Sequence, residues 1–158
     1  MAIFGAENTK VYVKTAGTTP TAFASTDLIP QGIVTEVAPE LSGESVEFET
    51  YASINRSRIA SARDFSLALT LTYDPNDTAL NKFINAFNTQ NRLLDVLLVV
   101  GDEPNTGAKN LAVYGRMAVE SISVNTPSRN IVTVRAQLRL ADGATLVLAR
   151  DVTAYPSL

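Results

Sequence analysis

The chain has 158 residues, no cysteine and no histidine, and a formal net charge of −3. This length suits one domain with a single core, and the missing residue types exclude disulfides, cysteine-ligated zinc and the commonest general base near neutral pH. The acidic balance argues against a nucleic-acid-binding face, which needs clustered lysine and arginine. We find no catalytic constellation among the remaining residue types. We therefore predict one domain, residues 1–158, that is not an enzyme and holds no metal or cofactor.

The N-terminal part is predicted to contain two short strands joined by a long loop. Residues 1–9 carry no hydrophobic period and are therefore expected to form an arm. They are not expected to be a secretion signal, since they lack its basic start and apolar core. Residues 10–14 and 33–37 are interpreted as strands, and Pro39 is expected to end the second. Threonine, alanine, serine and glycine dominate residues 16–30, which indicates a loop.

Residues 40–63 are expected to form a long charged hairpin. Acids lie in its first half and arginines in its second: Glu40, Glu44, Glu47, Glu49, Arg56, Arg58 and Arg63. In one interpretation the two arms pair across the hairpin within one chain. In the other, acidic and basic arms meet in a neighbouring subunit, where such complementarity sets register more than affinity. The two interpretations are compatible in part, and both stay open at this point.

The next unit is predicted to be a strand followed by an amphipathic helix. The alternating residues 66–73 precede Asp74, which can act as the helix N-cap; Pro75 suits the first helical position, and Asp77 favours the positive end of the helix dipole. The helix is expected over about residues 75–88. Its apolar stripe, at the spacing i, i+3, i+4 and i+7, consists of Leu80, Phe83, Ile84 and Phe87.

The remainder of the chain is predicted to be a meander. Its expected strands cover residues 93–100, 111–117 and 119–124, with a bulge at Gly115, and residues 131–140 and 145–148, before a C-terminal arm at residues 150–158. The first of these strands is nearly all apolar, as in a strand covered on both faces, but it is far too short to cross a bilayer. About eight strands and one flanking helix predict a mainly β fold, a β-sandwich or distorted barrel with a long charged hairpin and extended terminal arms.

This order of elements resembles the major tail tube proteins of long-tailed, siphovirus-type bacteriophages. The resemblance covers residues 11–148 and includes the long loop, the charged hairpin, the strand-helix-strand unit and the final meander. It rests on Tyr73-Asp74-Pro75-Asn76-Asp77, Ser121-Ile122-Ser123-Val124, Pro127, Val132-Thr133-Val134 and Gly143. An acidic composition rich in threonine, alanine and valine supports it.

The resemblance implies a structural virion protein that closes into hexameric rings, which stack into a hollow tail tube. Sheets of neighbouring subunits would join into a barrel around the lumen, with the helix outside. Residues 40–63 would be the inter-ring loop, and residues 1–9 and 150–158 would bridge subunits. The candidate contacts for ring stacking are then Glu44, Glu47, Glu49, Arg56, Arg58 and Arg63.

The resemblance also implies partners and a location. The partners would be further copies of the chain and the tape-measure, tail-terminator and tail-tip proteins. DNA would pass through the lumen without specific binding, and no membrane would be involved. The subunit would assemble in the host cytoplasm and reside in the virion tail.

Two alternatives belong to other classes of machine or molecule. The first is the tube protein of a type VI secretion or contractile injection system, which has a related barrel. The second is a non-catalytic β-sandwich binding module, for which 7% aromatic residues without tryptophan is a poor composition. Two polar strand faces are candidates for a lumen surface: Ser66, Thr70 and Thr72, and Thr133, Arg135, Gln137 and Arg139. The two arginines would hold DNA unless they pair with acids or face outward.

Overall fold

The computed structural model describes residues 9–157 except 18–20, 31–32, 51–52, 90–91, 105–108, 130 and 142–143, and it describes no side chain within residues 44–63. Within these ranges the chain forms seven strands, one α-helix and one short 3-10 helix. In order they are β1 (Thr9–Thr15), η2 (Ser25–Asp27), β2 (Val34–Thr50), β3 (Ser53–Thr72), α1 (Ala79–Asn88), β4 (Leu93–Gly101), β5 (Asn110–Asn125), β6 (Thr133–Leu140) and β7 (Val147–Arg150). The predicted mainly β class with one helix is confirmed.

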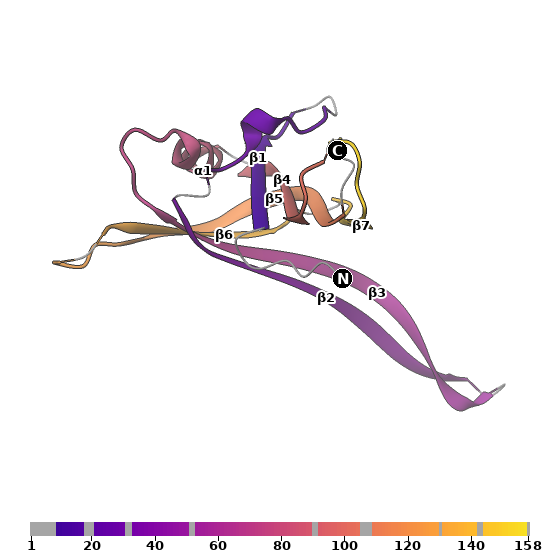
Figure 1. Ribbon diagram of the computed structural model, residues 1–158. Helices are drawn as coiled ribbons and strands as arrows, with labels where there is room; N and C mark the ends of the chain where they lie inside the picture. The colour runs from indigo at the N-terminus through magenta and orange to yellow at the C-terminus, as the bar shows by residue number, and fades with distance from the viewer. Residues whose placement is uncertain are drawn as a thin grey trace.

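All seven strands belong to one antiparallel sheet with the order β1-β4-β5-β6-β3-β2, and β7 pairs with β5. The long strand β5 joins two parts of this sheet. Strand β4 pairs with one edge of the first half of β5. The other edge of β5 pairs first with β7 and then, over its second half, with β6. In Figure 1, β2 and β3 leave the body as a long hairpin, while the end of the β5–β6 hairpin points the opposite way.

Three pairs of predicted segments join into single long strands, so the structure has seven strands instead of about eight. Residues 33–37 continue into the first arm of the charged hairpin as β2, the second arm continues into β3, and residues 111–124 lie within β5. Pro39 does not end β2; it pairs with Leu67 in the regular register. The reason is that β2 is an edge strand, where a proline is tolerated.

The predicted bulge at Gly115 is wrong in position. Gly115 pairs regularly with Val96, and the register of β5 shifts between Val119 and Ser121 instead. A Cβ atom on Gly115 would lie 3.3 Å from Leu140 Cδ1 and 3.3 Å from the Thr145 carbonyl oxygen. The glycine therefore permits close packing of the chain after β6 against β5.

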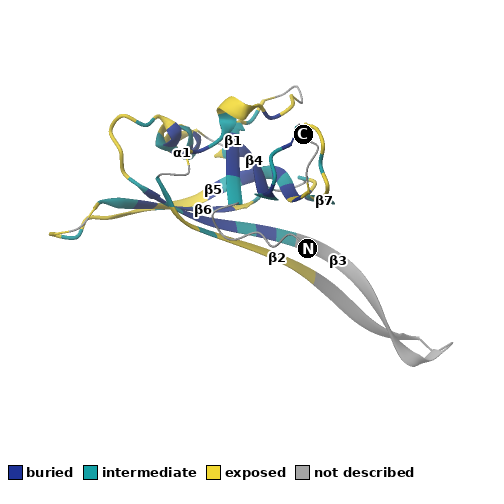
Figure 2. Ribbon diagram, in the orientation of Figure 1, coloured by how far each residue is buried: buried dark blue, intermediate teal, exposed yellow. Residues whose placement is uncertain are grey.

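The main core lies on one face of the sheet, beneath α1. Its largest fully buried side chains come from β3, α1, β4, β5 and β6 and include Phe65, Leu67, Leu69, Phe83, Leu94, Met117 and Leu138. A smaller cluster on the opposite face contains Tyr12, Phe23, Leu97, Val99 and Ala112. Strand β4 is consequently buried on both faces, as its apolar sequence predicts, and Figure 2 shows the buried residues gathered around it.

Residues 151–157 pack on the smaller cluster and do not extend from the domain as an arm. The Phe23 N–H donates to the Pro156 carbonyl at 3.0 Å, and the ring of Tyr155 meets that of Tyr12 edge-on at 5.6 Å between centroids. Burial raises the pKa of Tyr12 above its usual range. The tail thus closes the apolar cluster over β1. Of the predicted N-terminal arm, only Thr9 belongs to the described residues, and it begins β1.

Helix α1 begins at Ala79, four residues after the predicted start, and Asp74 is not its N-cap. The Asp74 carboxylate accepts the Asn76 N–H at 2.9 Å, which fixes a turn before the helix. Asp77 Oδ1 accepts the Ala79 N–H at 2.7 Å. Both carboxylates therefore accept backbone N–H groups, but Asp74 does so in the turn before the helix and Asp77 does so at the first helical residue.

The buried face of α1 differs from the predicted stripe at Ile84. The buried helix residues are Ala79, Phe83 and Ala86, while Leu80 and Phe87 pack on the core with part of their surfaces. Ile84 is 40% exposed. Because Ala79 and Ala86 are small, the helix backbone can approach the sheet along the face that carries them. Ile84 then points toward solvent.

One ion pair lies at the border of the smaller cluster. Arg116 Nε donates to Asp95 Oδ1 at 2.8 Å, and the Asp95 side chain is only 4% exposed. The hydrogen bond to Asp95 raises the pKa of Arg116. Arg116 Nη2 also donates to the Gly17 carbonyl at 2.8 Å. The pair therefore ties the loop after β1 to two central strands.

We predict that Phe83→Ala lowers the free energy of unfolding by about 3 to 5 kcal/mol, since it removes a fully buried ring from the core. Ile84→Ala, one residue along the same helix, should cost about 1 kcal/mol or less because its side chain is already half in solvent. Urea denaturation of the two variants tests this difference. Equal losses would show that the helix packs through the predicted stripe.

We predict that Asp95→Ala destabilises the fold by about 2 kcal/mol, because it leaves Arg116 partly buried without its partner. The matched control is Asp64→Ala, which breaks an exposed pair with Arg139 and should change stability little. Thermal unfolding followed by circular dichroism gives both values. A larger loss for Asp64→Ala than for Asp95→Ala would contradict the assignment.

Candidate assembly surfaces

The polar face of β2, β3, β6 and β5 is the first candidate surface. Directly opposed residues on neighbouring strands share a face of the sheet. The register aligns Glu36, Thr70, Arg135 and Ser123 in one row and Glu40, Ser66, Arg139 and Ala118 in another. The two polar faces that the sequence offered as lumen candidates are thus a single continuous face. It lies on the opposite side of the sheet from the main core.

Acids accompany the arginines on this face. Arg139 Nη2 and Nε donate to Asp64 Oδ2 at 3.0 and 3.2 Å, and Arg139 Nη1 lies 4.0 Å from Glu120 Oε1. The hydrogen bond to Asp64, followed by the charges of Asp64 and Glu120, raises the pKa of Arg139. Among the described residues this face carries four acids and two arginines: Glu36, Glu40, Asp64, Glu120, Arg135 and Arg139. The face is therefore not a cationic surface.

Two strand edges without a partner among the described strands border the polar face on opposite sides. No described strand pairs with the outer edge of β2, and β4 ends its pairing with β5 at Ala118, so residues 120–125 have a partner only in β6. Edge strand β1 differs. Leu28 bridges to Tyr12, the Ile29 N–H donates to the Val11 carbonyl at 2.9 Å, and Lys82 Nζ donates to the Val13 carbonyl at 2.7 Å. The chain thus covers the β1 edge itself and leaves these two edges beside the polar face uncovered. Among the described strands, β7 and residues 53–65 of β3 also lack a partner on one side.

The long hairpin carries all six predicted ring-stacking residues. Glu44, Glu47 and Glu49 lie in β2, and Arg56, Arg58 and Arg63 lie in β3; their side chains are outside the described residues. The backbone register places Glu47 opposite Arg58. In Figure 1 this part of the hairpin extends far beyond the body of the domain. The other six predicted residues, from Asp74 to Phe87, belong to α1 and the turn before it and do not approach this tip.

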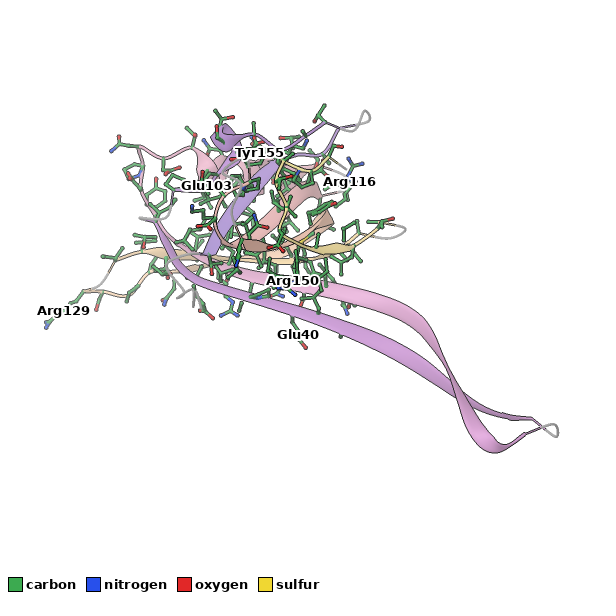
Figure 3. All side chains as sticks on the ribbon, turned by 45° about the vertical axis from the view of Figure 1, so that its right-hand side comes forward. Glu40, Glu103, Arg116, Arg129, Arg150 and Tyr155 are labelled. Carbon is green, nitrogen blue, oxygen red and sulfur yellow. The ribbon has the colours of Figure 1, made fainter. Side chains whose placement is uncertain are left out.

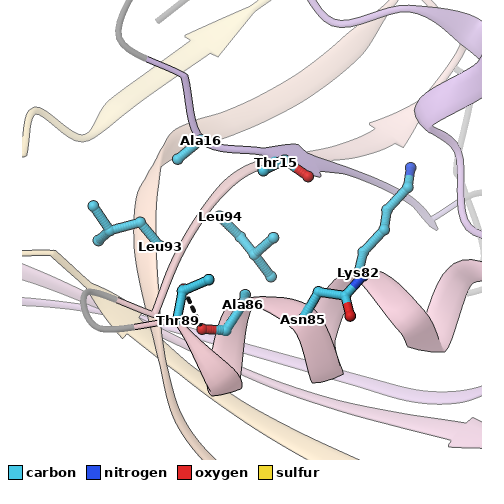
Figure 4. A pocket seen from close by; sticks show the side chains of 8 residues that line it. All are labelled: Thr15, Ala16, Lys82, Asn85, Ala86, Thr89, Leu93 and Leu94. Carbon is cyan, nitrogen blue, oxygen red and sulfur yellow. Dashed lines mark hydrogen bonds between the residues drawn. The ribbon is translucent and has the colours of Figure 1, made fainter.

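A groove of about 290 Å³ lies between α1, the end of β1 and the start of β4 (Figure 4). Its lining residues are Thr15, Ala16, Lys82, Asn85, Ala86, Thr89, Leu93 and Leu94. The Lys82 ammonium is already bound to the Val13 carbonyl, and Thr89 Oγ1 donates to the Ala86 carbonyl at 2.7 Å. This set holds no acid, base or nucleophile pair that could carry out a reaction. No helix in the described ranges is long and apolar enough to cross a membrane.

Sequence reasoning missed the two acid partners of Arg139 and the pair between Asp95 and Arg116. Asp64 is 75 positions from Arg139 along the chain, so no local pattern connects them. A weak signal existed for Asp95, which is the only charged residue in an otherwise apolar strand. An acid at such a position needs a buried partner from a neighbouring strand.

No family model matches the sequence, and no curated protein matches it. The fold is similar to several solved structures. The SPP1 tail tube has a TM-score of 0.68 and 12% identity, covering 95% of this chain and 81% of that one. The tail of the empty gene transfer agent particle, refined with C6 symmetry, has a TM-score of 0.63 and 11% identity, covering 90% and 98%. The sheath-tube complex of the extracellular contractile injection system PVC has a TM-score of 0.60 and 16% identity, covering 93% of each chain. The chain therefore has the fold of the tail tube proteins.

Proposed function

We propose that this chain is a structural subunit that polymerises as stacked hexameric rings into a tail tube, a conduit for DNA into a host cell. The observation that carries the proposal is the pair of open edges on a domain with the tail tube fold. An uncovered edge presents unpaired N–H and C=O groups and is a template for another strand. If the β2 edge of one copy pairs with residues 120–125 of β5 in the next, each copy uses both edges and the ring closes.

Ring closure has dimensions that suit a conduit. Each copy contributes β2, β3, β6 and the second half of β5, so six copies provide about 24 strands. With strands about 4.8 Å apart and tilted about 40°, such a barrel is about 48 Å across at the backbone. Barrels of this size leave an open channel, here wide enough for a DNA duplex. The helix and the main core lie on the opposite side of the sheet and would form the outer layer.

The charge of the polar face supports passage of DNA without binding. A surface that binds phosphates presents lysine and arginine without acidic neighbours. Here Arg139 has Asp64 and Glu120 beside it, and acids outnumber arginines on the described part of the face. In this proposal the face lines the lumen, and DNA meets a wall of hydroxyl groups, paired arginines and an excess of acids.

The long hairpin would reach the adjacent ring. We propose Glu44, Glu47, Glu49, Arg56, Arg58 and Arg63 as the contacts between rings. The opposition of Glu47 and Arg58 in the register supports pairing within one hairpin, and the length of the hairpin supports contact with a neighbour. Partners of the complete tube would be tape-measure, tail-terminator and tail-tip proteins, and the subunit would reside in the virion tail after assembly in the host cytoplasm.

A tube of a contractile injection system is the second candidate, because the PVC sheath-tube complex shares the fold. A tube in that setting needs a sheath around its outer surface, where the exposed side of α1 would lie. Cosedimentation of assembled tubes with the product of a sheath gene from the same genome would separate the two settings. Neither setting requires the chain to be an enzyme.

We predict that the purified chain at high concentration forms rings or hollow tubes with six-fold symmetry. Negative-stain electron microscopy shows the particles, and size-exclusion chromatography measures the unassembled fraction. Two uncovered edges on each copy lead to this expectation, since both are used only in a closed ring. A closed dimer that never grows, or a monomer at every concentration and salt tested, would contradict the proposed function.

We predict that Arg56→Glu, Arg58→Glu and Arg63→Glu together stop ring stacking while the domain stays folded. The matched variant carries Glu44→Arg, Glu47→Arg and Glu49→Arg and should fail in the same way. An equimolar mixture of the two should form tubes again if acidic and basic arms meet in different copies. If the pairs form only within one hairpin, the mixture stays unassembled. Normal tubes from either variant alone would show that the charges of the hairpin do not form the contact between rings.

A further inference from the structure

Exposed large hydrophobic residues gather at the two ends of β5. The described residues include seven of them, and five belong to these ends: Tyr73, Val124 and Ile131 at one, Leu111 and Leu148 at the other. Single exposed apolar residues are ordinary, but groups of them mark interaction surfaces. In Figure 2 the β5–β6 hairpin end is largely exposed, and β7 lies on the opposite side of the body.

The first group, which we call the hairpin-end patch, consists of Tyr73, Val124 and Ile131. The three residues lie at the ends of three neighbouring strands. The Tyr73 N–H donates to the carbonyl of Val132, next to Ile131, at 2.9 Å, and Val124 pairs with Val134. Val124 is 60% and Ile131 67% exposed. These side chains are on the outermost part of the sheet, where the described chain does not cover them.

The second group, which we call the β7-end patch, consists of Leu111 and Leu148 with the half-buried Val100 beside them. Val100 is opposite Leu111 in the register of β4 and β5, and Leu148 is opposite Val113 in that of β5 and β7. Since side chains two positions apart on a strand share a face, Leu111 and Leu148 are diagonal neighbours on one face. Both are more than 40% exposed.

The two patches cannot meet within one copy. Val124 is thirteen positions after Leu111 in β5, and a strand rises about 3.3 Å per residue, so the patches are about 43 Å apart. In Figure 3, Arg129 in the β5–β6 turn lies at the far end of that hairpin, while Arg150 at the end of β7 lies at the body of the domain. Contact between unlike patches of two copies is heterologous, and such contacts form either closed rings or open lines of copies. Where the sheet edges already close the ring, this contact is left to repeat along the tube.

We propose that the hairpin-end patch of one copy packs on the β7-end patch of a copy in the next ring, as an apolar contact that propagates the tube. This inference rests on the proposed function, because it uses rings that the open edges close. Each end also carries one exposed acid and one exposed arginine: Asp74 and Arg129 at the hairpin end, Asp151 and Arg150 at the β7 end. Opposite charges are therefore available across the contact, and neither end repels the other by net charge.

The small size of the patches accounts for assembly by rings. A stable contact between two separate proteins buries at least about 1,000 Å² in total, which two or three half-exposed side chains do not supply. Six such contacts between two rings act together, because the first one holds the remaining five in place. The contact is consequently negligible between free subunits and becomes effective once rings exist.

Cross-linking in assembled tubes tests the inference, and a chain without cysteine makes introduced thiols unambiguous. The variants are Val124→Cys and Leu148→Cys, treated with a short bis-maleimide after assembly. We expect covalent dimers when the two variants are assembled together and a ladder of longer products when both changes are in one chain. Neither variant alone should give dimers. Dimers from Val124→Cys alone, or tubes without any cross-linked product, would overturn the inference and leave the proposed function in place.

Point changes give a second readout that does not depend on linker geometry. Ile131→Asp and Leu148→Asp should each raise the concentration needed for tube formation roughly tenfold, which corresponds to about 1.4 kcal/mol per subunit. Ile131 lies outside residues 120–125, so its change does not touch the edge proposed to close the ring. Ile131→Val keeps a β-branched apolar side chain and serves as the control, and unfolding in urea should be nearly unchanged because both sites are exposed. Tubes from both aspartate variants at the wild-type concentration would overturn the contact. Absence of rings and tubes from the wild-type chain would instead overturn the proposed function, and with it the inference.

Discussion

The arrangement of the whole domain depends on how the backbone hydrogen bonds of its outer strands are satisfied. Each strand carries a row of N–H and C=O groups along both edges, and a row without a partner is a site of further pairing. The chain covers the β1 edge with residues 28–29 and Lys82, but it covers neither β2 nor the second half of β5. Edge protection is thus selective. The uncovered β2 edge and the second half of β5 belong to the same four strands that carry the polar face.

The two faces of those strands have opposite requirements, which the register satisfies together. One face buries Leu67, Leu69 and Leu138 beneath α1, and the other presents hydroxyl groups and paired charges. Because alternate residues point to opposite faces, a slip of one position would exchange the two sets. The core therefore specifies the register, and the register in turn places Arg139 beside Asp64. Packing on the core face therefore controls the placement of charges on the polar face.

Sequence patterns predicted the elements that depend on local signals, including the strand-helix-strand unit, the apolar β4 and the alternating β6. They failed where tertiary position decides. Pro39 suggested the end of a strand, but position at a sheet edge made it acceptable. Asp74 and Asp77 are equally able to hold N–H groups, so their spacing could not fix where α1 begins. The exposure of Ile84 depends on which helix face meets the sheet, and the partners of Arg139 come from distant segments that no local pattern links.

The register shift at Glu120 shows why one strand can serve both parts of the sheet. Before it, Met117 and Val119 face the main core; after it, Ile122 packs on that core and Ser121 lies on the polar face. If the same sequence paired without this register shift, Ser121 and Ser123 would point into the core, and Ile122 would join the polar surface. The bulge thus restores alternation at the position where β4 stops pairing with β5. The β5 edge is open beyond Ala118 because β4 begins at Leu93, and the register shift just after this point keeps the polar face of the open part polar.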